Sequence, residues 1–351
     1  MGEGKHPKQE NKSNMKFKTK ISDITEHEYR ELDVASYSLL KAIADEGPGV
    51  IADKVFKTGA ALEFGQLVDI LITRPEDKDE IFHTKAIEKP TASLLQLADS
   101  ILMDALVNDE EFEDITYGQI ELRIKELGLW SSMVDNAKLR AKYDNDLFYN
   151  YLKESIAAKG KIIVTPEILS AATKCANVLL YHDYTKEFFE ETDDIEVIKQ
   201  AKILYKFKGI QCKAMLDLIV IDHKNKIIKP FDIKTGAELP GDFQIPFYKY
   251  RYYLQVVAYL LAIQSIVEQS DEFRDYKIEP FRFMYVSKKL PDVPVIFEVP
   301  ENLLNSFVDG WDDNRGFMDL LLDYGYYTSN SIYHTERRVV EKKGKFTITL
   351  K

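Results

Sequence analysis

Two hydrophobic runs separated by a short polar turn stand out in the second half of the chain. The runs cover residues 214–221 and 227–233, and the turn between them reads His223-Lys224-Asn225-Lys226. Apolar runs on either side of such a turn are typical of a β-hairpin. The pattern therefore predicts two paired antiparallel strands in this stretch.

The rest of the pattern predicts more strands beside this hairpin and helices over most of the first half. Further strands are expected over 195–207, 210–221, 281–286 and 295–299, with Lys208-Gly209 as a tight turn between the first two. Helices are expected over these stretches: from Ser36 or Ser38 to the Gly47-Pro48-Gly49 cluster, 60–71, several between 76 and 160, Thr165 to about His182, 247–267 and 301–323.

This order of elements predicts an α/β fold with a large helical N-terminal half. We expect one domain over residues 31–325, with a helical insertion at about 76–160. Residues 1–30 are expected to form a disordered basic tail, and residues 326–351 a polar C-terminal tail.

The composition is that of a globular protein. The chain has 351 residues, of which 45% are hydrophobic and 30% charged, and this is enough for a buried core. No stretch approaches the roughly 18 apolar residues of a membrane span, and no apolar signal segment follows the N-terminus, so the cytoplasm is the expected location. The net charge of −11 is neutral evidence, because nucleic-acid affinity depends on local basic groups.

Three charges interrupt the two apolar runs: Asp217, Asp232 and Lys234. A charge in an apolar strand costs free energy unless a partner compensates it. If the turn is centred between Lys224 and Asn225, Asp217 lies opposite Asp232, with Cβ atoms about 4.5–5.5 Å apart. Facing carboxylates repel each other unless they share a proton or a cation, and Mg²⁺ prefers oxygen ligands. The hairpin thus predicts a magnesium site. The alternative is a surface acidic pair relieved by lysines.

The Asp-x-Lys spacing has weight only in its context. It also occurs at 222–224 and 275–277, but only Asp232 and Lys234 lie at the end of an apolar strand. Strand alternation places these two side chains on one face and Ile233 on the other.

Two further stretches carry candidate side chains on predicted helices. In the helix over 247–267, Gln255 and Tyr259 share one face, which Arg251 and Tyr252 make aromatic and partly basic. By spacing alone, such a stripe is more often part of a core.

Asp69, in the helix over 60–71, lies beside an apolar stripe formed by Phe64, Leu67, Val68 and Leu71. An acid is less expected beside such a stripe than on the outer face of a helix. The segment by itself is equally compatible with a plain solvent-exposed acid.

These residues together resemble a known nuclease family. Asp217, then Asp232-Ile-Lys234-Thr235, then Gln255-xxx-Tyr259 resemble the PD-(D/E)XK nuclease core with its trailing QxxxY motif. Within that superfamily the chain is similar to the RecE (exodeoxyribonuclease VIII)-like exonucleases of phages and prophages. The resemblance covers roughly residues 33–312, and the portion 212–259 is its most specific part.

The resemblance implies a restriction-endonuclease-like core, with a mixed central sheet flanked by helices. It implies that Asp217 and Asp232 ligate Mg²⁺, with Mn²⁺ as a substitute, and that Lys234 orients or activates the attacking water. Gln255 and Tyr259 would line the DNA-facing side of the site. We expect Arg251 and Tyr252, on the same helix, to contact DNA as well.

The sequence departs from this family at one site residue. The first motif of the family usually ends in His, whereas the matching residue here is Asp69. Aspartate is a competent ligand for a hard metal ion, so we expect Asp69 to be a third ligand. Related helicase-associated nucleases carry four cysteines for an iron–sulfur cluster, which Cys175 and Cys212 cannot supply.

The resemblance implies a Mg²⁺-dependent exonuclease that resects linear double-stranded DNA ends and leaves a strand for a single-strand annealing protein. Some exonucleases of this kind form ring-shaped homo-oligomers, and a phage-derived enzyme would act in the cytoplasm of its bacterial host. Two alternatives stay open. One is an endonuclease that cuts branched or single strands. The other is a DNA-binding or assembly protein with weakened catalysis, which Asp69 in place of His would explain.

Overall fold

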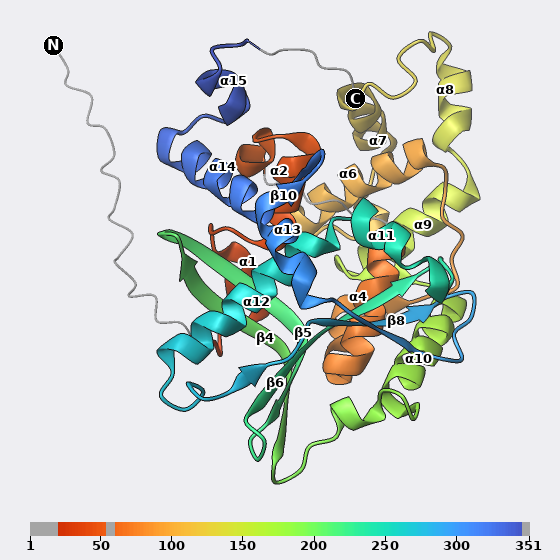
Figure 1. The fold of residues 1–351 in the computed structure, drawn as a ribbon. Coiled ribbons are helices and arrows are strands. Elements are labelled where there is room, and N and C mark those ends of the chain that lie inside the picture. Colours follow the sequence, from red (N-terminus) through yellow and green to blue (C-terminus); the bar gives the residue numbers. More distant parts are fainter. Residues whose placement is uncertain (1–19, 54–59, 346–351) are drawn as a thin grey trace, which may run out of the picture.

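The hydrophobic runs of the second half form one mixed sheet in the computed structural model (Figure 1). The structure describes residues 20–53 and 60–345. Seven strands of this part of the chain belong to the sheet. In sheet order, they are β1 (Lys20–Ile21), β4 (Ile195–Phe207), β5 (Ile210–Asp222), β6 (Ile227–Gly236), β8 (Arg282–Ser287) and β9 (Val295–Glu298), with β7 (Lys277–Ile278) also beside β6. β6 is parallel to β7 and β8, and the other neighbours are antiparallel.

The β5–β6 hairpin has the predicted register. The two strands pair from Asp222 opposite Ile227 to Leu218 opposite Phe231, as a turn centred between Lys224 and Asn225 requires. Because a shift of one residue would move every apolar side chain to the other face, burial on both faces of the sheet holds this register.

Turn and capping residues lie where the sequence predicts them. Lys208 and Gly209 connect β4 to β5 with φ values of 49° and 83°, which suits a two-residue turn of type I′. Ser36 caps α2 (Tyr37–Glu46) by accepting a backbone N–H bond, and Gly47 ends that helix. Thr165 caps α10 (Pro166–Tyr181) in the same way.

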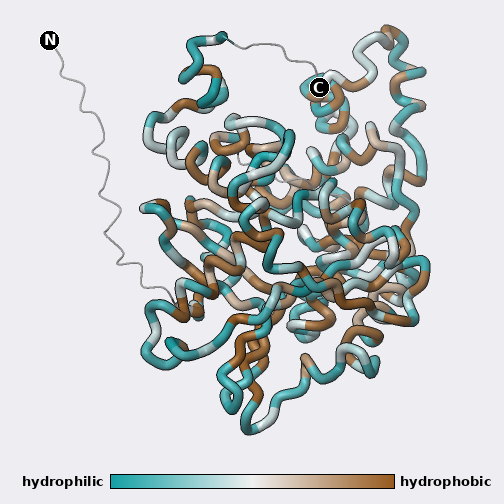
Figure 2. Tube along the Cα trace, viewed as in Figure 1, coloured by the Kyte–Doolittle hydropathy of each residue, from teal (hydrophilic) through white to brown (hydrophobic). Residues whose placement is uncertain are grey.

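Helices cover both faces of the sheet and confirm the α/β class. On one face, the core under α2, α12 (Tyr252–Gln269), α13 (Leu304–Asp309) and α14 (Phe317–Asn330) includes side chains of all four helices. On the other face, α4 (Ala60–Thr73) and α10 pack on the sheet around a second core. Figure 2 shows the hydrophobic stretches running through the centre of the molecule, where the sheet lies.

The predicted helical stretch 76–160 forms a lobe with its own core. It contains α6 (Ala92–Asn108), α7 (Tyr117–Glu126), α8 (Asn136–Tyr143) and α9 (Asp146–Ala157), packed around residues such as Leu97 and Phe148. Two short strands beside this lobe were not predicted from the sequence. β2 (Phe82–Thr84) and β3 (Ile162–Val164) form a small parallel sheet at the base of the lobe. Each strand has three residues, too few for a periodic signal.

The single helix predicted over 247–267 is wrong, because the structure has two. α11 (Gln244–Lys249) ends before Tyr250, and α12 begins after Arg251. Arg251 has a left-handed backbone with φ of 54°, which a continuous right-handed helix excludes. Tyrosines continue across this break, with Lys249 and Arg251 between them, and this pattern is equally compatible with one helix.

The single helix predicted over 301–323 is also wrong. The structure has η5 (Glu301–Leu303), α13, a hairpin of β10 (Gly310–Trp311) and β11 (Asn314–Arg315), and then α14. Gly310 has φ of 92°, and a Cβ atom there would lie 2.7 Å from the Asn314 carbonyl oxygen, so the turn needs glycine. α14 runs on to Asn330.

Both ends of the chain contain more structure than the tails predicted for them. Of the basic tail predicted at 1–30, residues 1–19 lie outside the described residues. The remainder forms β1, paired with β4, and the start of α1 (Glu26–Glu31). Near the C-terminus, Arg337 of α15 (Arg337–Glu341) makes ion pairs with Asp319 and Asp323 of α14. These contacts hold α15 against the domain.

The remaining described elements are short: α3 (Gly49–Asp53), α5 (Lys78–Ile81), η1 (Pro75–Asp77), η2 (Phe112–Asp114), η3 (Lys186–Phe189) and η4 (Pro240–Asp242). Among the described residues, no helix combines the length and apolar character needed to cross a membrane.

Candidate active site

β5 and β6 separate at the predicted acidic pair. Their ladder ends at Leu218 opposite Phe231. Beyond this pair, β5 continues along β4 and β6 continues along β8. Asp217 and Asp232 are the next residues on the two strands, so they lie at the mouth of this fork. The N–H of Ile233, which has left the ladder, donates to Asp217 Oδ2 at 2.8 Å. At the fork, backbone polar groups are therefore not used in ladder hydrogen bonds between β5 and β6.

The β4–β5 ladder is interrupted at the same level. It omits the pair formed by Gln200 and Asp217, and Gln200 has a left-handed backbone with φ of 51°. Before this point Leu216 packs under α12, and after it Leu218 packs under α4 and α10. Residues two apart normally share a face. The side-chain alternation is therefore reversed at Asp217, where the two cores meet.

Asp232 is the most buried member of the cluster, with 1% of its surface exposed. Its Oδ2 accepts a hydrogen bond from Lys234 Nζ. Its Oδ1 accepts one from Gln255 Nε2 at 2.6 Å, and the same amide donates to Tyr259 OH at 3.0 Å. Helix α12 thus reaches the strand through Gln255, and the carboxylate is held from both sides.

Lys234 is a cation in this setting. Burial alone lowers the pKa of Lys234, but the negative charge of Asp232, aided by Tyr252 and Asp217, raises it above the usual value of a lysine. Nζ lies 4.9 Å from the ring centroid of Tyr252 and 5.8 Å from that of Phe283. The ammonium group is therefore enclosed by one carboxylate and two aromatic rings.

Asp69 joins the cluster from the opposite face of the sheet. Burial, opposed by Arg74 and reinforced by the charge of Asp232, raises the pKa of Asp69 to about 7. Gln200 Nε2 donates to both its oxygens, at 2.8 and 3.0 Å. Burial and the charges of Asp232 and Asp69 raise the pKa of Asp217 well above its usual range. The three carboxylates therefore repel one another, as closely placed acids do.

The donor set has the chemistry that a divalent cation needs, but not yet the arrangement. Carboxylate oxygens are the ligands that Mg²⁺ prefers, and the repulsion among Asp69, Asp217 and Asp232 would be relieved by a cation. Gln255 Oε1 is a buried acceptor that no described residue supplies with a donor. However, no group of three His, Cys, Asp or Glu side chains within residues 20–53 and 60–345 is gathered closely enough to hold a metal ion. A bound cation would require these side chains to rearrange.

The four side chains expected to contact DNA have other partners in the structure. Gln255 and Tyr259 are buried behind Asp232, with 4% and 8% of their surfaces exposed. Arg251 Nε donates to Asp45 Oδ1 at 2.9 Å, and Tyr252 packs beside Lys234. These contacts support positioning roles, whereas DNA contact by these residues stays a prediction.

Two residues near the cluster were missed by the sequence analysis. Gln200 gives no signal, because nothing in the composition of its strand indicates a left-handed backbone. Tyr37 donates from its hydroxyl to the Tyr250 carbonyl at 3.3 Å. Burial raises the pKa of Tyr37, and the charge of Lys234 opposes this, so the two side chains lie within electrostatic range of each other. Tyr37 directly follows Ser36, the N-cap residue of α2.

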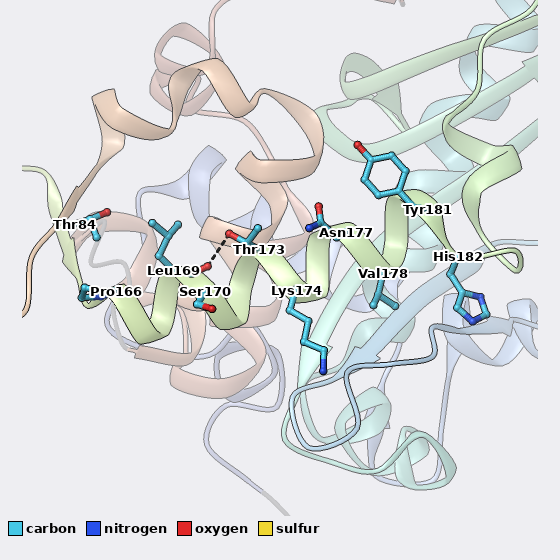
Figure 3. A pocket seen from close by; sticks show the side chains of 10 residues that line it. All are labelled: Thr84, Pro166, Leu169, Ser170, Thr173, Lys174, Asn177, Val178, Tyr181 and His182. Carbon is cyan, nitrogen blue, oxygen red and sulfur yellow. Dashed lines mark hydrogen bonds between the residues drawn. The ribbon is translucent and has the colours of Figure 1, made fainter.

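A surface groove lies elsewhere on the molecule. It has a volume of about 800 Å³ and follows one side of α10, between Pro166 and His182 (Figure 3). None of the clustered acids lines it, so it is separate from the candidate site.

Comparisons with known proteins place few limits on the function. No family model and no curated protein matches the chain. The structure is similar to the crystal structure of a candidate exonuclease from Eubacterium rectale, with 13% sequence identity and a TM-score of 0.47. The similarity covers 94% of this chain and 95% of that chain. The function must therefore be argued from the site itself.

Proposed function

We propose that this protein is a metal-dependent deoxyribonuclease of the PD-(D/E)XK type, which digests linear double-stranded DNA from its ends. The observation that carries the proposal is the fork between β5 and β6, where Asp217 and Asp232 meet beside Lys234. From α4, the charge of Asp69 raises the pKa of Asp217, and the charge of Asp232 raises the pKa of Asp69. The RecE-like resemblance supports the exonuclease class and a partner that anneals the remaining strand.

The residues can divide the work of phosphodiester hydrolysis. Asp69, Asp217 and Asp232 would hold Mg²⁺ or Mn²⁺. When bound, this ion would polarise the phosphoryl group and lower the pKa of a water molecule. Lys234 places a compact positive charge beside the negative charge that develops on phosphorus. Because the pKa of Lys234 is raised, charge stabilisation suits it better than proton acceptance.

Gln255 and Tyr259 contribute from behind the carboxylates. The Gln255 amide fixes the orientation of Asp232, and the Tyr259 hydroxyl holds that amide. Buried groups that orient a ligand commonly matter nearly as much as the ligand itself.

The test compares linear and closed-circular duplex DNA in Mg²⁺, in Mn²⁺ and in EDTA. We expect digestion of the linear form only, and only with a divalent ion. Lys234→Ala should reduce the rate by about 10²–10³-fold, as the loss of one charge-stabilising donor does. The matched control is Lys224→Ala, which removes the lysine of the Asp-x-Lys match at 222–224 in the exposed hairpin turn. This variant should leave the rate unchanged.

Three outcomes would contradict this proposal. Undiminished digestion by Lys234→Ala would exclude the site. Cleavage of closed circles would indicate an endonuclease instead. Binding of DNA ends without product in any divalent ion would indicate a binding protein on this scaffold. Recovery of hydrolysis in Asp69→His would then show that Asp69 is the reason for the missing activity.

A further inference from the structure

Helix α11 and the residue that follows it carry exposed tyrosine side chains near the candidate site. One side of α11 is anchored, because Phe247 packs against Phe283 and Phe307 at ring distances of 5.9 and 5.8 Å. Tyr248 and Tyr250, in contrast, are 44% and 38% exposed. Exposed tyrosines on a rigid, well-packed support are suited to contact a partner.

A continuous series of contacts connects these tyrosines to the carboxylate cluster. Lys234 Nζ lies 4.9 Å from the Tyr252 ring centroid. The Tyr252 and Tyr250 rings are 5.9 Å apart, and Lys249 Nζ lies 5.2 Å from the Tyr250 ring. Two neighbouring tyrosine rings, with a lysine at each end, therefore connect the buried Asp232 to the surface.

Lys249 is the cation of this series that is accessible to a ligand. Arg251 is already paired with Asp45, and Lys234 with Asp232. Lys249 is exposed and makes no ion pair with any described residue. Its position beside the Tyr250 ring places a positive charge next to an exposed aromatic face.

This combination fits the chemistry of one nucleic-acid form. An unpaired strand offers base faces for stacking and phosphates for lysine, whereas a duplex buries its base faces. We infer that Tyr248, Lys249 and Tyr250 form a stacking surface that receives single-stranded DNA and leads its backbone to the fork. This inference rests on the proposed function, since it names the form in which the substrate reaches that site.

Binding of a fluorescent oligothymidine, measured by anisotropy in EDTA, tests the surface without hydrolysis. Tyr250→Ala should weaken binding by about tenfold, which is the size expected for one lost stacking contact. Tyr250→Phe retains the ring and should bind like the wild type. Lys249→Ala should weaken binding and lower its dependence on salt concentration. Tyr181→Ala is the matched control, because Tyr181 is an exposed tyrosine on α10, and it should have no effect.

Three results would overturn the inference: wild-type affinity in Tyr250→Ala, equal losses in Tyr250→Ala and Tyr181→Ala, or blunt duplex bound as tightly as the oligothymidine with the same response to Tyr250→Ala. Failure of the proposed function would appear separately, as no metal-dependent hydrolysis of bis(p-nitrophenyl) phosphate by the wild-type protein. In that case a loss of oligothymidine binding confined to Tyr250→Ala and Lys249→Ala would still support the surface.

Discussion

Gln200 joins an unfavourable backbone conformation to a candidate metal ligand. A left-handed backbone costs a non-glycine residue about 1–2 kcal/mol, and Gln200 adopts one opposite Asp217. From this position its amide donates to both carboxylate oxygens of Asp69. The conformation is thus coupled to the orientation of Asp69, which suggests that the strain serves the site.

Substitutions at Gln200 can separate the backbone effect from the side-chain effect. We expect Gln200→Gly and Gln200→Ala to lower metal-dependent hydrolysis by a similar factor, roughly tenfold, because both remove the donor to Asp69. Gln200→Gly should have the higher free energy of unfolding, by about 1 kcal/mol, because glycine adopts positive φ without strain. Urea titrations and initial rates measure the two quantities. Equal stabilities of the two variants would contradict a left-handed backbone at this position.

Lys213 illustrates a buried charge that stabilises the fold rather than the site. Its Nζ donates to the carbonyl oxygens of Tyr29, Arg30 and Leu32 at 2.8, 3.2 and 2.9 Å, at the end of α1. Lys213→Met leaves these acceptors without this donor and should lower the free energy of unfolding by about 3 kcal/mol. Lys206→Met, on an exposed position of β4, should change it by less than about 0.5 kcal/mol. A similar loss in both would show that the contacts at α1 contribute little.

At the scale of elements, the sequence predicts the features that depend on neighbouring residues, such as turns and strand register. The β5–β6 register follows from the turn and from apolar alternation, and it places Asp217 and Asp232 directly after the last pair of the ladder. The break at Arg251 could not be predicted, because the pattern of 247–267 is equally compatible with one helix. At the break, Arg251 makes a tertiary contact, the ion pair with Asp45 of α2, which a local pattern does not contain. The hydrogen bond from Gln255 to Asp232 could not be predicted for the same reason, since Asp232 belongs to a distant strand.

The Asp45–Arg251 pair should show the pH dependence of a carboxylate with a lowered pKa. Partial burial raises the pKa of Asp45, but hydrogen bonds from Lys41 and Arg251 outweigh this, so the pKa lies below its usual value. The stabilisation is therefore present above the unfolded-state pKa of about 3.9 and is lost as the pH falls through the folded-state pKa.

A double-mutant cycle with Asp45→Ala and Arg251→Ala measures this coupling. We expect a coupling free energy of about 0.5–1 kcal/mol at pH 7, because the pair is partly exposed. It should disappear in acid, below the folded-state pKa of Asp45. A coupling that persists unchanged there would show that α2 and the α11–α12 junction are held together by packing rather than by charge.

At the scale of the whole molecule, the candidate site lies where β4 and β5 begin to contribute to the second core as well as to the first. On one side of Gln200 and Asp217, the buried residues of β4 and β5 belong to the core under α12, and on the other side they belong to both cores. Here the charge of Asp232 acts on Asp69, which belongs to the helical layer of α4. Gln255, which belongs to the layer of α12 on the other face, donates a hydrogen bond to the same Asp232. The site therefore depends on both layers, and stability and cation binding should be linked.

Asp217→Asn tests that linkage. Without divalent ions, we expect this variant to be more stable than the wild type, on the order of 1 kcal/mol, because it removes one of three repelling carboxylates. Asparagine keeps an oxygen that can accept the Ile233 N–H. With Mg²⁺ at 100 times its Kd, the wild type should gain about 2.7 kcal/mol, and Asp217→Asn should gain far less. The control is Asp193→Asn, which alters an exposed acid and should follow the wild type in both conditions. Thermal unfolding with and without Mg²⁺ measures all three proteins. Equal Mg²⁺ stabilisation of Asp217→Asn and the wild type would remove Asp217 from the ligand set, because a site that loses a ligand cannot keep the same affinity.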